Sequence, residues 1–90
     1  MEIFIDAVKT IAGRSITVSV LALSGQLVNS VSVSLDDSLL GEDLLPFPRV
    51  SYRRTWHWDG GVIPADTHEV VVMAVDQKGR QEMASRKWQD

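Results

Sequence analysis

The sequence predicts an all-β protein of six or seven short antiparallel strands, arranged as a sandwich or a small barrel. Apolar residues recur at a period of two in most segments, which is typical of half-buried strands. Turn-forming residues interrupt the chain about every 8–12 residues. Glycine and proline break up the remaining apolar runs, so no helix of substantial length is expected.

Length and composition indicate one folded domain over residues 1–90. Ninety residues is the size of a small single domain. The chain is 44% hydrophobic and 23% charged, with a formal net charge of −3, a balance that favours a folded core over disorder. Two alternatives stay open here, a whole protein or one module of a longer chain.

The composition also argues against several partners and kinds of site. A mildly acidic chain with scattered lysines and arginines lacks the basic face of a nucleic-acid binder. The absence of cysteine excludes disulfides, thiolate nucleophiles and cysteine-based metal sites. No run approaches the roughly 18 apolar residues of a membrane span. The segment SITVSVLALSG alternates like a strand, unlike a signal peptide, so the default expectation is a cytoplasmic protein.

The first half of the chain predicts three strands. MEIFIDAV is the first, with Ile3 and Ile5 on one face. Residues 15–21 and 27–35 alternate apolar side chains with serine and threonine around a short SGQ turn. We predict that these two segments pair as an antiparallel hairpin with one serine-rich face in water. Val28 breaks the alternation and marks a strand start, a bulge or an exposed edge position.

The segment DDSLLGEDLLPFP, residues 36–48, is predicted to be the longest irregular stretch. One of its first two aspartates could cap a single helical turn through Leu39 and Leu40. Gly41 and the two prolines prevent a longer helix. We expect the leucines of this segment to cover one end of the core.

The segment RVSYRRTWHW, residues 49–58, is predicted to be a core strand. Its even positions carry the aromatic rings and one valine, and we expect them to face inward: Val50, Tyr52, Trp56 and Trp58. Arg54 shares that parity and could extend to solvent, stack on a ring or pair with Asp76.

The segment THEVVVMAVD is apolar on both faces over residues 70–75. Such a strand is covered on both sides, or its second face meets a partner. A QKG turn and a last strand, RQEMASRKW, follow. Four residues are expected in turns, the last of them with a positive φ: Gly13, Gly25, Gly79 and Asp66.

No arrangement of residues predicts an active site, a cofactor site or a metal site. His57 and His68 are the two histidines, expected on adjacent strands, and neither lies in a serine-nucleophile or H-E-x-x-H motif. The acidic pairs LDDS and GEDL lack the alternate spacing of a calcium loop. We therefore expect a protein that is not an enzyme and carries no cofactor.

The aromatic strand holds the candidate interaction residues: Arg53, Arg54, Trp56, His57 and Trp58. The favoured interpretation is that the tryptophan rings fill the core, opposite the small Ala74. Two alternatives remain, a stacking platform for a sugar or base completed by Trp88, and a protein interface, where tryptophan, tyrosine and arginine are enriched.

Residues 52–81 resemble the end of immunoglobulin-like bacterial sandwich modules, in particular the dimerisation domain of the sulfite-oxidase-type molybdenum oxidoreductases. Five features carry the resemblance: the pair Trp56 and Trp58, the turn Pro64-Ala65-Asp66-Thr67, the strand end Ala74-Val75-Asp76, Gly79 and Gln81. VNSVSVSLDD is similar to the strand before the central turn of that family. Asp66 replaces the turn glycine of the family, and no cysteine is present to ligate molybdenum.

The resemblance implies an immunoglobulin-like antiparallel β-sandwich of six or seven strands without the enzymatic activity. The predicted function is a non-catalytic module for protein interaction or assembly, with self-association as one form of it. The alternative is a module that binds a carbohydrate or another small ligand through exposed aromatic rings. No nucleic-acid or membrane partner is expected.

Overall fold

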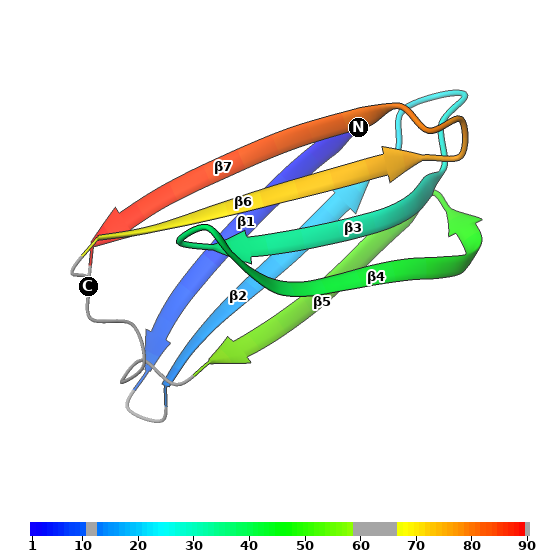
Figure 1. Cartoon of the computed structure of the whole chain (residues 1–90). Helices are drawn as coiled ribbons and strands as arrows, with labels where there is room; N and C mark the ends of the chain where they lie inside the picture. Colours follow the sequence, from blue (N-terminus) through cyan, green and yellow to red (C-terminus); the bar gives the residue numbers. More distant parts are fainter. Residues whose placement is uncertain (11–12, 59–66, 90) are drawn as a thin grey trace.

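The computed structural model describes residues 1–10, 13–58 and 67–89, and it confirms the all-β class (Figure 1). The described residues form seven strands: β1 (Glu2–Thr10), β2 (Gly13–Leu21), β3 (Val28–Leu35), β4 (Ser38–Arg49), β5 (Ser51–Trp58), β6 (Thr67–Asp76) and β7 (Gln81–Gln89). Within this part of the chain there is no helix with the length and apolarity to cross a membrane.

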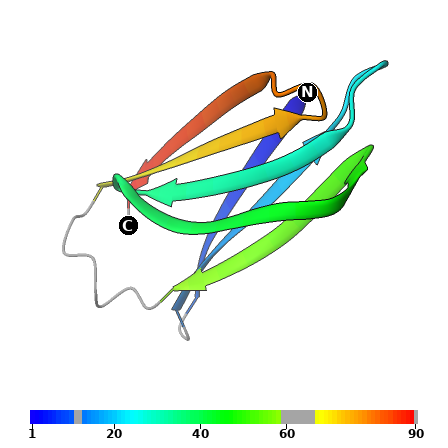
Figure 2. The same cartoon turned by 45° about the vertical axis from the view of Figure 1, so that its right-hand side comes forward.

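The strands form two antiparallel sheets that lie face to face (Figures 1 and 2). One sheet has the order β1-β2-β5 and the other has the order β4-β3-β6-β7. The predicted hairpin between residues 15–21 and 27–35 is wrong, because β2 pairs with β1 and β5 whereas β3 pairs with β4 and β6. Alternation reveals which face of a strand is dry, but both strands have the same alternation and it does not select their neighbours.

The core lies between the sheets and consists mainly of β-branched side chains. It confirms the predicted inward parity of β2 and β3, and it shows which of the two apolar faces of β6 is the inner one. The core residues of these three strands are fully buried except for a slightly exposed Leu35: Ile16, Val18, Val20, Val28, Val31, Val33, Leu35, Val70, Val72 and Ala74. Val28 is the first residue of β3 and adjoins a register shift, so it is a strand start beside a bulge and not an exposed edge residue.

Residues 36–48 differ from the prediction, since they form a turn and most of the longest strand. Asp36 and Asp37 have φ angles of 49° and 67° and join β3 to β4. Two positive φ angles are those of a type I′ hairpin turn, which matches the twist of the paired strands. The hairpin therefore replaces the expected helical turn. Both prolines fall within 45–48, four β4 residues that stand opposite the single β3 residue Asn29. Because β4 is an edge strand and bulges there, proline removes no ladder hydrogen bond that the sheet requires.

Strand β5 confirms part of the predicted inward face. Tyr52 and Trp56 are buried, with 9% and 7% of their surface exposed. Val50 is 67% exposed, so its predicted inward position is wrong. It precedes β5, at a bend where its carbonyl oxygen accepts a hydrogen bond from the amide of Ala22 at 2.9 Å. The prediction that the leucines of β4 cover the core holds only in part. Leu40 and Leu45 pack against the core, whereas Leu39 and Leu44 are exposed.

The turn predictions have mixed outcomes. Gly25 and Gly79 lie in turns and both have a φ of 82°, as glycine readily allows. Gly13 is the first residue of β2 rather than a turn residue. Asp66 lies outside the described residues.

Replacing Trp56 with alanine should lower the free energy of unfolding by about 3–5 kcal/mol, because a buried aromatic ring leaves a large cavity. Urea denaturation followed by circular dichroism measures this loss. The exposed neighbour Arg53 is the control, and Arg53→Ala should change stability by less than about 0.5 kcal/mol. A loss under about 1 kcal/mol for Trp56→Ala would contradict the core position of the ring.

Candidate functional site

The predicted interaction residues all lie on β5, but they do not converge on one surface. Arg53 and His57 are exposed on the outer face of the three-stranded sheet. Trp56 is buried on the opposite face of the strand. Arg54 lies beside it on the side where β5 meets β4. Trp58 ends β5, and its side chain is outside the described part of the structure.

Arg54 lies at the side of the sandwich where the edge strands β4 and β5 meet, and it covers the ring of Trp56. Its guanidinium carbon lies 5.0 Å from the ring centroid of Trp56, which is within range of a cation–π contact. Its nitrogen also donates a hydrogen bond to the carboxylate of Asp43 on β4. The stacking alternative for Arg54 is therefore confirmed. The predicted pairing of Arg54 with Asp76 is wrong, because Arg54 pairs with Asp43 and Asp76 pairs with Arg80.

Asp43 binds two β5 residues at once. Besides Arg54, the Tyr52 hydroxyl donates to Asp43 Oδ2 at 2.5 Å. The Arg54 and Tyr52 hydrogen bonds hold the pKa of Asp43 below its usual value, although burial opposes them. Burial and the negative charge of Asp43 raise the pKa of the Tyr52 hydroxyl. Near neutral pH, Asp43 is therefore ionised and Tyr52 is neutral. Their hydrogen bond and the Arg54–Asp43 ion pair hold the edge strands β4 and β5 of the two sheets together.

Gly41 lets Trp56 cross the gap between the sheets. A Cβ atom at Gly41 would lie 2.3 Å from the indole Nε1 and 3.1 Å from Cδ1. Any side chain at this position must therefore displace the ring. This contact spans two sheets and 15 positions of sequence, so no local pattern predicts it.

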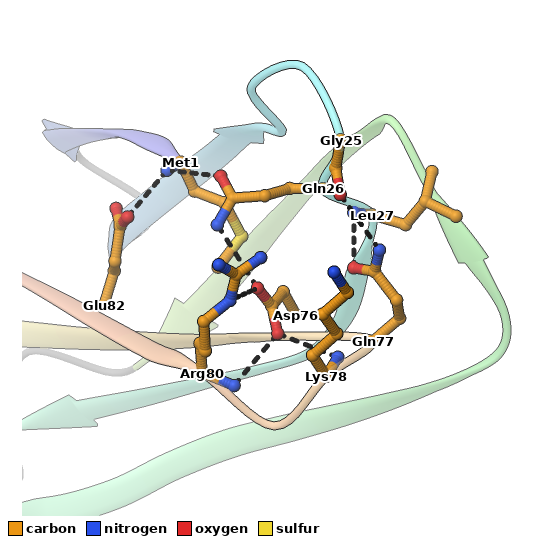
Figure 3. A network of polar contacts seen from close by, with 9 residues as sticks. All are labelled: Met1, Gly25, Gln26, Leu27, Asp76, Gln77, Lys78, Arg80 and Glu82. Carbon is orange, nitrogen blue, oxygen red and sulfur yellow. Dashed lines mark hydrogen bonds and ion pairs between the residues drawn. The ribbon is translucent and has the colours of Figure 1, made fainter.

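A second polar cluster surrounds Asp76 at the end of β6 (Figure 3). Asp76 is fully buried. Its carboxylate accepts hydrogen bonds from the amides of Lys78 and Arg80 at 2.9 Å each and from Arg80 Nε at 2.8 Å. Gln26 Nε2 donates a fourth at 3.2 Å. Burial alone would raise the pKa of Asp76, but these donors together lower it to about 2.

The Asp76 cluster continues to the first residue of the sequence and to the segment that joins the sheets. The α-ammonium of Met1 donates to Glu82 Oε1 at 2.8 Å and to Gln26 Oε1 at 3.2 Å. The amide of Leu27 donates to Gln77 Oε1 at 2.7 Å (Figure 3). These contacts attach the crossing segment to the β6–β7 turn, so their role is to fix the connection between the sheets.

A third cluster lies at the start of β6 and includes one of the two histidines. His68 is 1% exposed, and its Nδ1 lies 2.8 Å from Asp36 Oδ2 in the β3–β4 turn. The amide of Glu69 donates to Asp36 Oδ1 at 2.8 Å. Partial burial opposes ionisation of Asp36, but the hydrogen bonds with His68 and Glu69 outweigh it and lower the pKa of the carboxyl.

The two histidines do not form a common site. His57 lies on β5 and His68 on β6, and these strands belong to different sheets, so the expectation of adjacent strands is wrong. Within the described ranges, no group of three or more histidine and carboxylate side chains is arranged to hold a metal ion.

The outer face of the four-stranded sheet is apolar at its centre. On β6, Val71, Met73 and Val75 point away from the core and are partly exposed. Met83 on β7 is paired with Met73 and is 66% exposed. On the other side of β6 the paired β3 positions are all serines: Ser30, Ser32 and Ser34.

A shallow hollow adjoins this surface between β6 and β7. Its lining residues are Glu69, Val71, Met83, Ala84 and Ser85. On the opposite side of the molecule, the outer face of the three-stranded sheet is more polar. Phe4 and Leu21 are exposed on it, but charged and hydroxyl residues make up most of its paired positions: Glu2, Asp6, Ser15, Thr17, Ser19, Arg53 and Thr55. The two outer faces therefore differ in chemistry, and the apolar one is the candidate functional surface.

Sequence reasoning identified one column of this surface and missed the rest. The continuous apolar run over residues 70–75 indicated β6. Leu39 and Leu44 on β4 are also exposed on this face, where they are paired with Ser34 and Ser30. The places of these leucines and of Met83 depend on the pairing of β4 with β3 and of β7 with β6, which the sequence does not state.

Comparison with protein-family models, with curated proteins and with solved structures gave no match.

Gly41→Ala should destabilise the protein by about 1–3 kcal/mol, because the new methyl group overlaps the indole of Trp56. The same substitution in a Trp56→Leu background should cost much less, since leucine does not reach as far. Urea denaturation of the four proteins gives the coupling between the two positions. Equal costs in both backgrounds would contradict the contact.

Asp76→Asn should destabilise the protein at neutral pH, and the deficit should shrink in acid. The pKa of Asp76 is about 2 in the folded chain against 3.8 in the unfolded one. The stabilisation from the ionised carboxylate is therefore complete above about pH 4 and is lost as the pH falls toward about 2. Melting temperatures between pH 7 and pH 2 test this, with Asp37→Asn at an exposed turn position as the control. A deficit that stays constant across this range would contradict the assignment.

Proposed function

We propose that this chain is a non-catalytic protein-interaction or assembly module, and that the outer face of its four-stranded sheet is the docking surface. One observation carries the proposal: β6 is a central strand with apolar side chains on both faces, and among the described residues an element of the chain covers only its inner face. Strands of that composition are normally covered on both sides. A contiguous apolar surface on a soluble domain is typical of an interaction site.

The sheet orders support an immunoglobulin-like arrangement. In constant-type immunoglobulin domains the third, sixth and seventh strands share one sheet, and the first, second and fifth share the other. The same grouping occurs here. The fourth strand departs from it, because β4 pairs with β3 rather than with β5. This shift widens the sheet whose outer face is apolar.

The polar clusters favour a structural role over catalysis. His68 is enclosed by the fold, and its Asp36 partner also binds the backbone of Glu69. Asp76 has no exposed surface and is surrounded by donors from its own turn. Each of these groups holds strands and turns together, and none presents a reactive atom to a substrate.

Trp56 argues against the alternative of a ligand platform. Its ring is only 7% exposed and Arg54 lies over it, so it is not free to stack on a sugar or base. The interaction module is therefore the function that the arrangement supports best.

A photo-crosslinking amino acid at position 83 should form covalent adducts with a protein partner, because Met83 projects from the proposed docking surface. The same residue at position 19, on the outer face of the other sheet, is the matched control. Irradiation of the purified chain and of cells that produce it, followed by mass spectrometry, gives the adducts. The absence of adducts at position 83, or equal yields at both positions, would contradict the proposed surface.

A further inference from the structure

We propose that the partner of the apolar sheet face is a second copy of this chain, related by a two-fold axis that runs parallel to the strands. This inference rests on the proposed docking function of that face. It adds the identity of the partner and the geometry of the contact, both of which follow from the pattern of side chains across the sheet.

The outer face carries a column of small side chains beside a column of large ones. The register pairs Ser30 with Val75, Ser32 with Met73 and Ser34 with Val71. Directly paired residues point to the same face of a sheet. The serine column of β3 therefore forms a trough, and the β6 column forms a ridge next to it.

A two-fold axis along the strands, between β3 and β6, places the ridge of each copy over the trough of the other. Met73 then lies over Ser32 of the second copy, and the valines lie over the remaining serines. An axis across the strands would instead stack ridge on ridge and trough on trough, which leaves voids that close packing does not tolerate. The surface is therefore complementary to itself in one arrangement, as an isologous contact requires.

The same axis explains an exposed leucine and the shallow hollow. It lays β4 of one copy over β7 of the other. Leu39 is 64% exposed. The register places four residues in one row across the four strands: Leu39, Ser34, Val71 and Ser85. Leu39 therefore lies at the level of the hollow that Val71 and Ser85 help to line, and it enters that hollow in the second copy.

Charges at one end of the face are also complementary. The β3–β4 turn lies at the level of the Glu69–Lys87 pair, because the Asp36 amide donates to the Glu69 carbonyl at 2.9 Å. Asp37 is exposed in that turn, and the side chain of Lys87 is 73% exposed. The axis brings Lys87 of each copy to Asp37 of the other. Glu42 is the one charged residue in the rows of Val71, Met73 and Val75, and the register puts it level with Met83. The axis therefore places Glu42 over Met83 of the second copy at the outer margin of the contact, where the exposed carboxylate can extend into water.

The size of the face sets the expected strength. Four strands about 4.8 Å apart and some eight residues long give roughly 400–500 Å² on each copy. Stable specific interfaces bury about 800 Å² per partner. The dimer is therefore expected to be weak and reversible, and to form at micromolar to millimolar concentrations.

Sedimentation equilibrium from about 10 µM to 1 mM tests the inference. The unmodified chain should shift from monomer to dimer over this range. Met73→Glu should lower the association constant at least tenfold, because it places a charge on the ridge. Ser32→Lys places a charge in the trough and should also weaken association. It is the variant to measure if Met73→Glu does not fold. Ser19→Glu, on the outer face of the other sheet, is the matched control and should leave association unchanged.

Charge reversal tests the symmetry. Lys87→Asp and Asp37→Lys should each weaken self-association several-fold, since each creates two like-charge contacts in a homodimer. An equimolar mixture of the two variants should recover it, because both contacts in the mixed dimer are of opposite charge. Native mass spectrometry distinguishes the mixed dimer from the two homodimers by mass.

The outcomes separate this inference from the function on which it rests. A concentration-dependent dimer that Met73→Glu disrupts and the mixture of reversed charges recovers supports both. A chain that stays monomeric, but crosslinks through position 83 to a different protein, overturns the second copy and leaves the docking surface. A dimer that Met73→Glu and Ser32→Lys both leave intact overturns the assignment of the face.

Discussion

The structure depends on the burial of one face of β6 and on the attachment of that strand at both ends. Val70, Val72 and Ala74 are fully buried between the sheets, where they form part of the core. At about 25 cal/mol for each square ångström of apolar surface removed from water, such residues supply the main favourable energy of a small domain. The carboxylates of Asp36 and Asp76 then hold turns against the two ends of the strand.

The polar clusters lie where strand edges or turns meet, and their hydrogen bonds hold these segments together. Asp43 binds Tyr52 and Arg54 across the side where β4 and β5 are edge strands. Gln26 and Gln77 attach the crossing segment to the β6–β7 turn. A buried carboxylate is stable only when several donors surround it, and Asp76 has four. The fold therefore uses its buried charges to determine connections, while the valines supply the stability.

The same central strand links the fold to the proposed function. Its inner face is required by the core, and its outer face is apolar without a covering element among the described residues. Two adjacent columns of unequal size on that face make the surface complementary to a copy of itself. A weak contact of this kind would let one small domain assemble reversibly without any change in its fold.

The sequence by itself determined the all-β class, the positions of most strands, the inward residues of β2 and β3 and two of those of β5, because alternation at period two is a local property of the chain. It did not determine which apolar face of β6 is the inner one, since both faces have the same character. Only the tertiary structure decided that β2 and β3 lie in different sheets, that residues 38–49 form a strand, and that Arg54 binds Asp43. Each of these depends on which segments meet in space. The packing of Trp56 on Gly41 is the clearest example, because nothing in the sequence around either residue indicates that the two are in contact. The face that we propose for assembly has the same origin, because its columns exist only once four strands are paired in register.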